Sequence, residues 1–302
     1  MFYEAIINGL IVGAIYAVVA LGYSLVYSVL GFVNFAHGDL LAVGVYLCLF
    51  LSTGGLGLPL LIAIPVAVGI TGLLAAGIGR LLLIPAAQKS SLAALLVAIG
   101  VSVILQSALA AVFTSEALPF HGGGFLGTTV SAWLPMKWLH VATLAGGVGS
   151  LALLWAFFFH RSALGLEIRA SASNPRAAQI LGLRREQVFT VVFLISGVFA
   201  ALAGIAVGLD DQLIVPTLGF SLGLRAFVAS VIGGIRSLGG AVAGGFLLGI
   251  TENLVAAAVL QVPKLAPYAG AFSKDAIAMV VLALVLTWRP RGVFDRSLET
   301  RP

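Results

Sequence analysis

Charged side chains are scarce in this sequence. They make up 9% of its 302 residues, whereas a soluble domain carries roughly 25%. Hydrophobic residues account for 61%, and the mean hydropathy is +1.14. Because no water-soluble surface can be built from such a composition, we predict an integral membrane protein, an all-α bundle with about eight transmembrane spans.

Cysteine and the motifs of common enzymes are nearly missing as well. The single cysteine, Cys48, lies in an apolar run, which excludes a disulfide framework. The sequence holds neither a Gly-x-x-x-x-Gly-Lys-Ser/Thr phosphate loop nor a His-Glu-x-x-His zinc motif. His37 and Asp39 do not suggest a metal pair, because no third ligand is near them in sequence. We therefore predict that the chain is not an enzyme and that it binds no cofactor and no metal itself.

The sequence contains a series of apolar runs. A helix that spans a membrane needs roughly 20 apolar residues. The runs cover residues 5–30, 40–51, 60–84, 92–113, 138–160, 188–209, 221–258 and 273–288. Glycines interrupt the run at 221–258, which we predict to be a short or re-entrant helix followed by a full one, with the glycines serving mainly close packing. Residues 1–302 are predicted to form a single transmembrane domain.

Basic residues predict the orientation of these spans. Two, five, one and four of the 16 lysines and arginines fall in residues 80–89, 161–187, 233–240 and 289–301. Alternating spans place these four segments on the same side, and the positive-inside rule makes that side the cytoplasm. The N-terminus is then outside and the C-terminus inside.

The longest polar interval, residues 161–187, contains a short helix with readable ends. Asn174 is a good N-cap, Pro175 suits the first helical position, and Gly182 suits the residue just past the end. A helix of about two turns is marginal by itself, so we interpret 175–181 as an element that docks against a partner. The alternative is an ordinary charged loop that only fixes topology.

A second polar interval, from Asn34 to Asp39, follows the first span. Gly31 and Gly38 would let its backbone leave helical geometry, which is tolerated in a membrane only inside protein or beside water. The segment either lines a transport pathway or is a plain cytoplasmic turn with Asn34 and Asp39 as caps.

Polar residues inside the spans complete the candidates. Glu252 is the main ionisable one, and it either lines a pathway or pairs with Arg225 for structure. Gln106, one helical turn from Ser102, either faces the pathway or stabilises helix packing. The pathway candidates are therefore Asn34, His37, Asp39, Gln106 and Glu252.

The sequence also contains a weak internal repeat. Residues 30–32 and 218–220 both read Leu-Gly-Phe, and the predicted topology places them on opposite faces of the membrane. Broken helices at matching places are found in transporters that are built from inverted repeats.

Several segments together resemble one family, the Liv-type permeases of branched-chain amino acid ABC transporters. They are Gly-Tyr-Ser-Leu-Val-Tyr at 22–27, Leu-Gly-Phe-Val-Asn-Phe-Ala-His-Gly-Asp at 30–39, Asn-Pro-Arg-Ala-Ala at 174–178, Leu-Gly-Leu at 181–183, the glycine-rich 231–241 and Arg-Pro-Arg-Gly-Val-Phe at 289–294. They occur in the right order over nearly the whole chain. Asn174 stands where an acid is common, Ser28 where glycine is common, and the pair Asp210-Asp211 is unusual, which leaves the substrate open.

The resemblance implies a permease subunit of an ATP-driven importer in the bacterial inner membrane. Its partners would be a second homologous permease, two cytoplasmic ATP-binding subunits that bind the ATP, and a periplasmic solute-binding protein. Residues 161–187 would be the cytoplasmic coupling loop, with contacts from Asn174, Pro175, Arg176, Ala177, Ala178, Leu181 and Gly182. The cargo would be branched-chain amino acids, or alternatively urea, short amides or aromatic acids.

Two other classes stay open on the residues alone. A stand-alone ion-coupled transporter or channel needs a buried acid in mid-span, for which Glu252 is the single candidate. A membrane enzyme needs a catalytic constellation, and we identify none.

Overall fold

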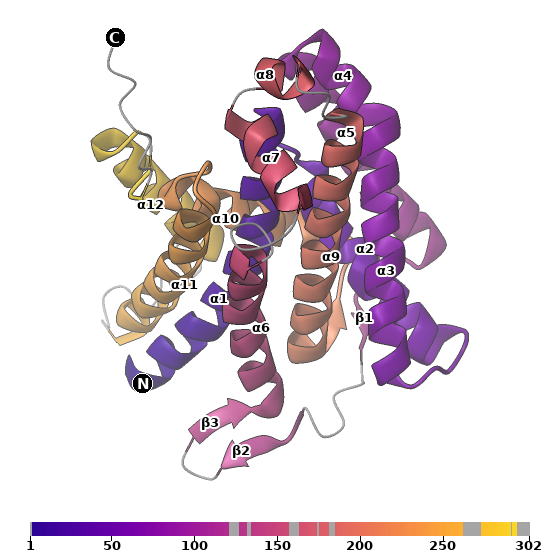
Figure 1. The fold of residues 1–302 in the computed structure, drawn as a ribbon. Coiled ribbons are helices and arrows are strands. Elements are labelled where there is room, and N and C mark those ends of the chain that lie inside the picture. The colour runs from indigo at the N-terminus through magenta and orange to yellow at the C-terminus, as the bar shows by residue number, and fades with distance from the viewer. Residues whose placement is uncertain are drawn as a thin grey trace.

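The computed structural model describes residues 2–120, 127–131, 134–156, 163–173, 175–180, 185–261, 273–290 and 292–294. These residues form a helical bundle, which confirms the all-α prediction (Figure 1). In chain order the helices are α1 (Phe2–Leu30), α2 (Ala36–Leu49), α3 (Leu60–Ile78), α4 (Ile84–Lys89), α5 (Ser91–Val112), α6 (Trp138–Ala156), α7 (Ala163–Ser173), α8 (Pro175–Ile180), α9 (Arg185–Asp211), α10 (Leu218–Gly233), α11 (Leu238–Gln261) and α12 (Lys274–Trp288).

Short elements connect the helices. The π-helical turns η1 (Phe50–Gly54) and η2 (Gly79–Leu83) prolong α2 and α3. Strand β1 (Leu118–Pro119) pairs antiparallel with β4 (Leu213–Ile214), and β2 (Thr129–Ser131) pairs antiparallel with β3 (Leu134–Lys137). The β2–β3 hairpin lies at one end of the bundle, and α4, α7 and α8 lie at the other (Figure 1).

Six of the described helical segments are long and apolar enough to cross a membrane. They are Phe2–Leu30, Ala36–Thr53, Leu60–Lys89, Ser91–Val112, Glu186–Asp211 and Leu238–Val259. The apolar segments Trp138–Leu154 of α6 and Leu218–Gly233, which is α10, are shorter. The apolar runs therefore predicted a multi-pass bundle correctly. The interrupted run forms a short helix, α10, followed by a full one, α11, as predicted. Gly234 separates the two helices with a φ of +104°, which only glycine adopts without strain.

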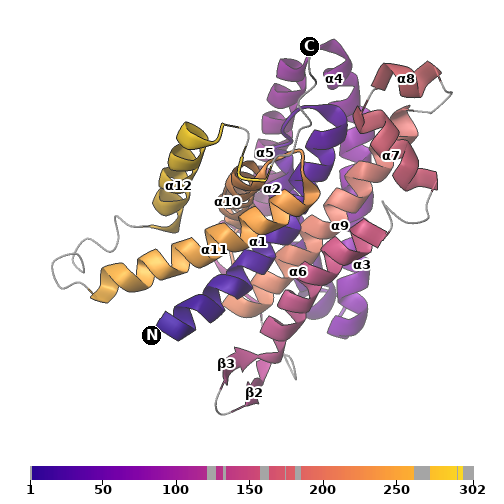
Figure 2. The ribbon, with the colours of Figure 1, turned by 60° about the vertical axis from the view of Figure 1, so that its left-hand side comes forward.

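Helix α1 forms the centre of the bundle. It is buried along most of its length and packs against α11, α9, α10 and α6. Helix α11 runs beside it (Figure 2), and glycines of the two helices face each other. A Cβ on Gly249 would lie 2.5 Å from the Cα of Gly13, and one on Gly9 would lie 2.7 Å from the Cα of Ile250. Small residues let membrane helices approach this closely.

Helices α2 and α10 begin next to each other inside the bundle. A Cβ on Gly219 would lie 2.8 Å from the Cα of Asp39, and one on Gly38 would lie 2.8 Å from the Cα of Gly223. Residue 219 thus packs against the start of α2, several positions past the first Leu-Gly-Phe segment at 30–32, and the placement of the two segments on opposite faces of the membrane stays a prediction. Phe35 is the N-cap residue of α2 and no side chain caps that helix, so the alternative in which Asn34 and Asp39 act as caps is wrong.

The C-terminal segment is attached to the end of α10. The backbone N–H groups of Val293 and Phe294 donate to the carbonyls of Ile232 and Gly233, at 2.8 and 3.1 Å. Gly292 has a φ of +89°, and its backbone lies against Gly234. These contacts explain why the sequence near 289–294 contains a glycine between the last span and the end of the chain.

Candidate functional site

Asp39 lies in the first turn of α2 and is completely buried. Ser102 and Gln106 of α5 interact with its carboxylate, but outside the distance and angle limits of a regular hydrogen bond, so that neither carboxylate oxygen has a partner within those limits. The Nε2 of Gln106 donates to the Oγ of Ser102 at 3.2 Å. The structure thus brings together two of the five pathway candidates, Asp39 and Gln106, from helices that are about 65 residues apart in sequence.

Asn34, in the break between α1 and α2, carries a second buried oxygen without a hydrogen-bond partner. Its side chain is 2% exposed, and its Oδ1 has no hydrogen-bond partner. Its backbone carbonyl accepts from the N–H of His37 at 3.1 Å. Because buried polar atoms in folded proteins are almost always hydrogen-bonded, unpartnered oxygens on both Asn34 and Asp39 single out this break as a polar site inside the bundle.

His37 is held by other parts of the protein. Its Nε2 lies 3.1 Å from the carbonyl of Val19 in α1, and its Nδ1 lies 2.9 Å from the Oγ of Ser196 in α9. A carbonyl oxygen only accepts, so Nε2 carries the hydrogen and Nδ1 accepts from the serine. The ring of Tyr23 packs edge-on at 4.6 Å. Both nitrogens of His37 are therefore used in tying α2 to α1 and α9.

The glycine opposite His37 gives a direct test of this tether. A Cβ on Gly22 would collide with the imidazole of His37 and would lie 3.1 Å from the Oγ of Ser196. We expect Gly22→Ala to destabilise the bundle by about 1–3 kcal/mol, the usual cost of overpacking a core. The thermal midpoint of the purified protein in detergent measures this. Gly69→Ala in α3 is the matched control, since nothing lies within 4 Å of the added methyl; equal midpoints for the two variants would contradict the tether.

Glu252 belongs to a different polar cluster. Its Oε2 accepts from the Tyr16 hydroxyl at 2.9 Å, and its Oε1 has no partner. The Nη1 of Arg225 donates to the same hydroxyl at 3.4 Å, and its Nε donates to Oδ1 of Asp275 at 2.6 Å. The suggested pairing of Glu252 with Arg225 therefore runs through Tyr16, and the direct ion-pair partner of Arg225 is Asp275. No described hydrogen bond joins this cluster to Asp39.

The predicted docking helix is present as α8, which begins at Pro175 as predicted and ends at Ile180. Arg176, Ala177 and Ala178 lie within it; Asn174, Leu181 and Gly182 lie outside the described residues. Ala178 is 4% exposed, whereas Ile180 is 86% exposed. Helix α8 contacts α7 and α9. It is thus anchored on one side and presents an apolar side chain to its surroundings at the end of the bundle (Figure 1).

The chain matches the family model described as "Branched-chain amino acid transport system / permease component" over residues 5–288. It belongs to this permease family. The high-affinity branched-chain amino acid transport system permease BraD of Pseudomonas aeruginosa is 31% identical over 98% of this chain and 96% of its own length. The LivH permeases of Salmonella typhimurium and Escherichia coli K12 are 32% and 31% identical over the same shares of the chains. These relatives are transport permeases, in line with the expectation of a transporter.

Among solved structures, PsaBC from Streptococcus pneumoniae in complex with Fab aligns with this permease at a TM-score of 0.49 and 16% identity, over 92% of this chain and 90% of that one. So distant a likeness does not bear on the function.

One short sequence in this permease matches the Gly-x-Ser-x-Gly motif of hydrolases, but the structure of the permease does not fit that motif. Residues 219–223 read Gly-Phe-Ser-Leu-Gly, the pattern of a nucleophile elbow, which requires a sharp strand-to-helix turn. Here the pattern lies within α10, and the Oγ of Ser221 accepts from Nη2 of Arg225 at 3.1 Å. Ser221 is therefore a helical residue that supports Arg225.

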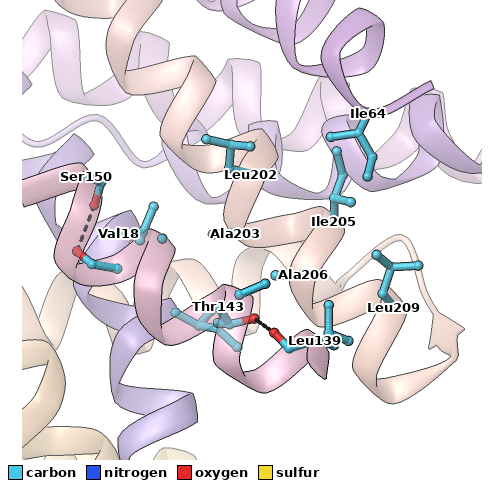
Figure 3. A pocket seen from close by; sticks show the side chains of 14 residues that line it. Val18, Ile64, Leu139, Thr143, Ser150, Leu202, Ala203, Ile205, Ala206 and Leu209 are labelled. Carbon is cyan, nitrogen blue, oxygen red and sulfur yellow. Dashed lines mark hydrogen bonds between the residues drawn. The ribbon is translucent and has the colours of Figure 1, made fainter. Parts of the chain in front are cut away.

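The permease also has a groove between α1, α6 and α9 with a volume of about 230 Å³ (Figure 3). Its walls are apolar, and its two hydroxyls are used within α6. Thr143 donates to the carbonyl of Leu139 and Ser150 to that of Gly147, both at 2.9 Å. Among the described residues that line the groove, no polar side chain is free, so the groove is poorly suited to a zwitterionic cargo.

The unusual acid pair lies at the end of α9, which extends to Asp211, two residues past the predicted apolar run at 188–209. Oδ1 of Asp210 accepts from the Nζ of Lys137 and faces the Nε2 of His140, both at 2.9 Å. Asp210 thereby ties the end of α9 to the start of α6.

Sequence reasoning missed Tyr16 and Ser196 as partners of candidate residues. Tyr16 and Tyr23 are seven positions apart, which places them on one face of α1, and this spacing was the available signal. Ser196 gives no such signal, because its contact with His37 spans 159 positions.

Proposed function

We propose that this chain is the transmembrane permease subunit of an ATP-driven importer that carries branched-chain amino acids into the cytoplasm. The observation that carries the proposal is the similarity, over 98% of the chain, to permeases named for high-affinity branched-chain amino acid transport. The chain has no phosphate loop of its own, so in the proposed importer separate ATP-binding subunits would bind the ATP. A second homologous permease and a periplasmic solute-binding protein would complete the importer in the bacterial inner membrane.

Helix α8 is the proposed contact with the ATP-binding subunits. Its exposed Ile180 and its anchored Ala178 support this role. The proposed contact residues are those of the predicted coupling set: Asn174, Pro175, Arg176, Ala177, Ala178, Leu181 and Gly182. Helix α4, whose last residue is Lys89, and helix α8 lie at the same end of the bundle (Figure 1). Because basic segments face the cytoplasm, this arrangement supports a cytoplasmic location for residues 161–187 and for the C-terminus.

A single substitution tests the coupling role. We expect Ile180→Asp to reduce the amount of ATP-binding subunit that co-purifies with the permease at least tenfold, because it places a charge where α8 exposes an apolar anchor. Leu213→Asp is the matched control: Leu213 is also apolar and 56% exposed, but it lies in β4, away from α8. Leucine-stimulated ATP hydrolysis by the reconstituted complex should follow the co-purification.

Two outcomes would contradict the proposal. Retention of the ATP-binding subunits by Ile180→Asp would remove the coupling role from α8. Leucine uptake by the purified chain alone, driven by an ion gradient in liposomes, would favour a stand-alone transporter instead. Binding of urea, a short amide or an aromatic acid, but not leucine, by the companion solute-binding protein would change the substrate and leave the importer class intact.

A further inference from the structure

The carboxylate of Asp39 differs from the other acids of the bundle. Asp210 faces Lys137 and His140, and Asp275 pairs with Arg225. Glu252 accepts from Tyr16 with one of its oxygens. Asp39 is 0% exposed and neither of its oxygens has a partner. No ion pair to it occurs in the described part of the chain.

A structural role does not account for this residue. Asp39 does not cap α2, whose N-cap is Phe35. The positive end of the α2 dipole favours an acid in the first turn, but this effect is small compared with the cost of burying an unpaired charge. A buried carboxylate of this kind in a membrane protein indicates a missing cationic partner.

The surroundings of Asp39 fit a primary ammonium group. The group offers three N–H donors, and the carboxylate and the Ser102 hydroxyl are acceptors that lie beside each other, with the Nε2 of Gln106 donating to that hydroxyl. Charge-assisted hydrogen bonds to a carboxylate are about twice as strong as neutral ones. Gln106 is half-buried and Ser102 is 4% exposed. The polar side chains of α5 therefore extend from the partly exposed Gln106 to the buried Ser102 beside Asp39.

We infer that Asp39 accepts the ammonium group of the transported amino acid, with Ser102 and Gln106 as its polar neighbours on α5. This inference rests on the proposed function, since it takes an amino acid as the cargo. Because Asp39 is sealed from solvent here, the ammonium group reaches it only when α2 and α5 separate during the transport cycle. The ATP-driven conformational change supplies that separation.

The first test uses the complete importer reconstituted in liposomes with its solute-binding protein. Asp39→Asn keeps the side-chain shape and removes the charge, and we expect leucine uptake to fall at least tenfold while the ATP-binding subunits still co-purify. Asp39→Glu, which keeps the charge, should retain more uptake than Asp39→Asn. Thr71→Val, which removes a buried hydroxyl of α3 that bonds only its own helix at Ala67, is the control and should transport normally.

The second test measures the chemical modification of Asp39 and does not depend on transport. A carbodiimide that partitions into membranes is allowed to modify Asp39 in the complete complex during ATP hydrolysis, and mass spectrometry follows the modified peptide. We expect 3-methylbutylammonium, which carries the alkyl chain and the ammonium of leucine, to slow the modification at least threefold. The neutral 3-methylbutanamide should not slow it.

The outcomes separate this inference from the proposed function. If wild-type complex imports leucine, Asp39→Asn imports it equally well and the amine gives no protection, the inference is wrong and the proposed function stands. If wild-type complex imports no leucine, the proposed function is wrong whatever Asp39 does. Protection by sodium chloride but not by 3-methylbutylammonium would replace the ammonium site with an inorganic cation site and overturn the inference.

Discussion

Replacing Gly249 with leucine is expected to abolish assembly of the transmembrane bundle. A Cβ at this position would lie 2.5 Å from both the Cα and the N of Gly13, and 2.7 Å from the carbonyl oxygen of Gly9. These are backbone atoms of α1, which is buried along most of its length by neighbouring helices. Unlike the end of a flexible side chain, they can yield only if the two helices move apart.

The expected effect is large because the contact between α1 and α11 is the main helix pair of the bundle. Overpacking a core by a methylene or two costs about 1–3 kcal/mol, and leucine adds four carbons at a point where the backbones touch. Native proteins are stable by only about 5–15 kcal/mol. Fluorescence-detected size-exclusion chromatography of a tagged chain should therefore show aggregate in place of a monodisperse peak.

Gly239→Leu provides the matched control within the same helix. Gly239 is exposed, and no atom lies within 4 Å of the position that a Cβ would take there, so we expect a normal peak. Gly249→Ala should give an intermediate result with a lowered thermal midpoint. A monodisperse Gly249→Leu protein with an unchanged midpoint would show that α1 and α11 do not approach each other as closely as the structure indicates.

The apolar runs predicted the helices well because the constraint that the bilayer imposes is local. A run must be long enough to cross the hydrocarbon core, and its polar flanks end it. The run at 5–30 became α1 (Phe2–Leu30), and the run at 92–113 became α5 (Ser91–Val112). The start of α8 at Pro175 was predictable for the same reason, since capping depends on neighbouring residues.

The arrangement of the polar candidates was not predictable, because it depends on contacts between distant parts of the chain. Tyr16 and Glu252 are 236 positions apart, and no local pattern in the sequence pairs them. The sequence placed Asn34, His37 and Asp39 in one functional segment. In the structure, His37 is engaged by α1 and α9, while oxygens of Asn34 and Asp39 are without partners.

Replacing Arg225 with methionine is expected to release α12 from the bundle. Arg225 is 16% exposed and lies in the middle of α10. It joins α12 through Asp275 at 2.6 Å and α1 through the Tyr16 hydroxyl at 3.4 Å. Removing one partner of a buried ion pair costs about 3–5 kcal/mol, but Asp275 is 51% exposed, so solvent screening reduces the expected loss to about 2 kcal/mol.

Hydrogen exchange distinguishes this local effect from general destabilisation. In Arg225→Met we expect faster amide exchange along α12 (Lys274–Trp288), with little change in α1 and α11, because stability in a folded protein is not uniform. Lys274→Met is the matched control, since it removes a neighbouring charge that forms no ion pair among the described residues. Amide exchange along α12 in Arg225→Lys should be intermediate between the rates in Arg225→Met and Lys274→Met. Lysine keeps the charge but lacks the planar guanidinium that reaches Asp275, Tyr16 and Ser221 together. Unchanged exchange of α12 in Arg225→Met would mean that apolar packing against α10, without the ion pair, is sufficient to hold this helix in place.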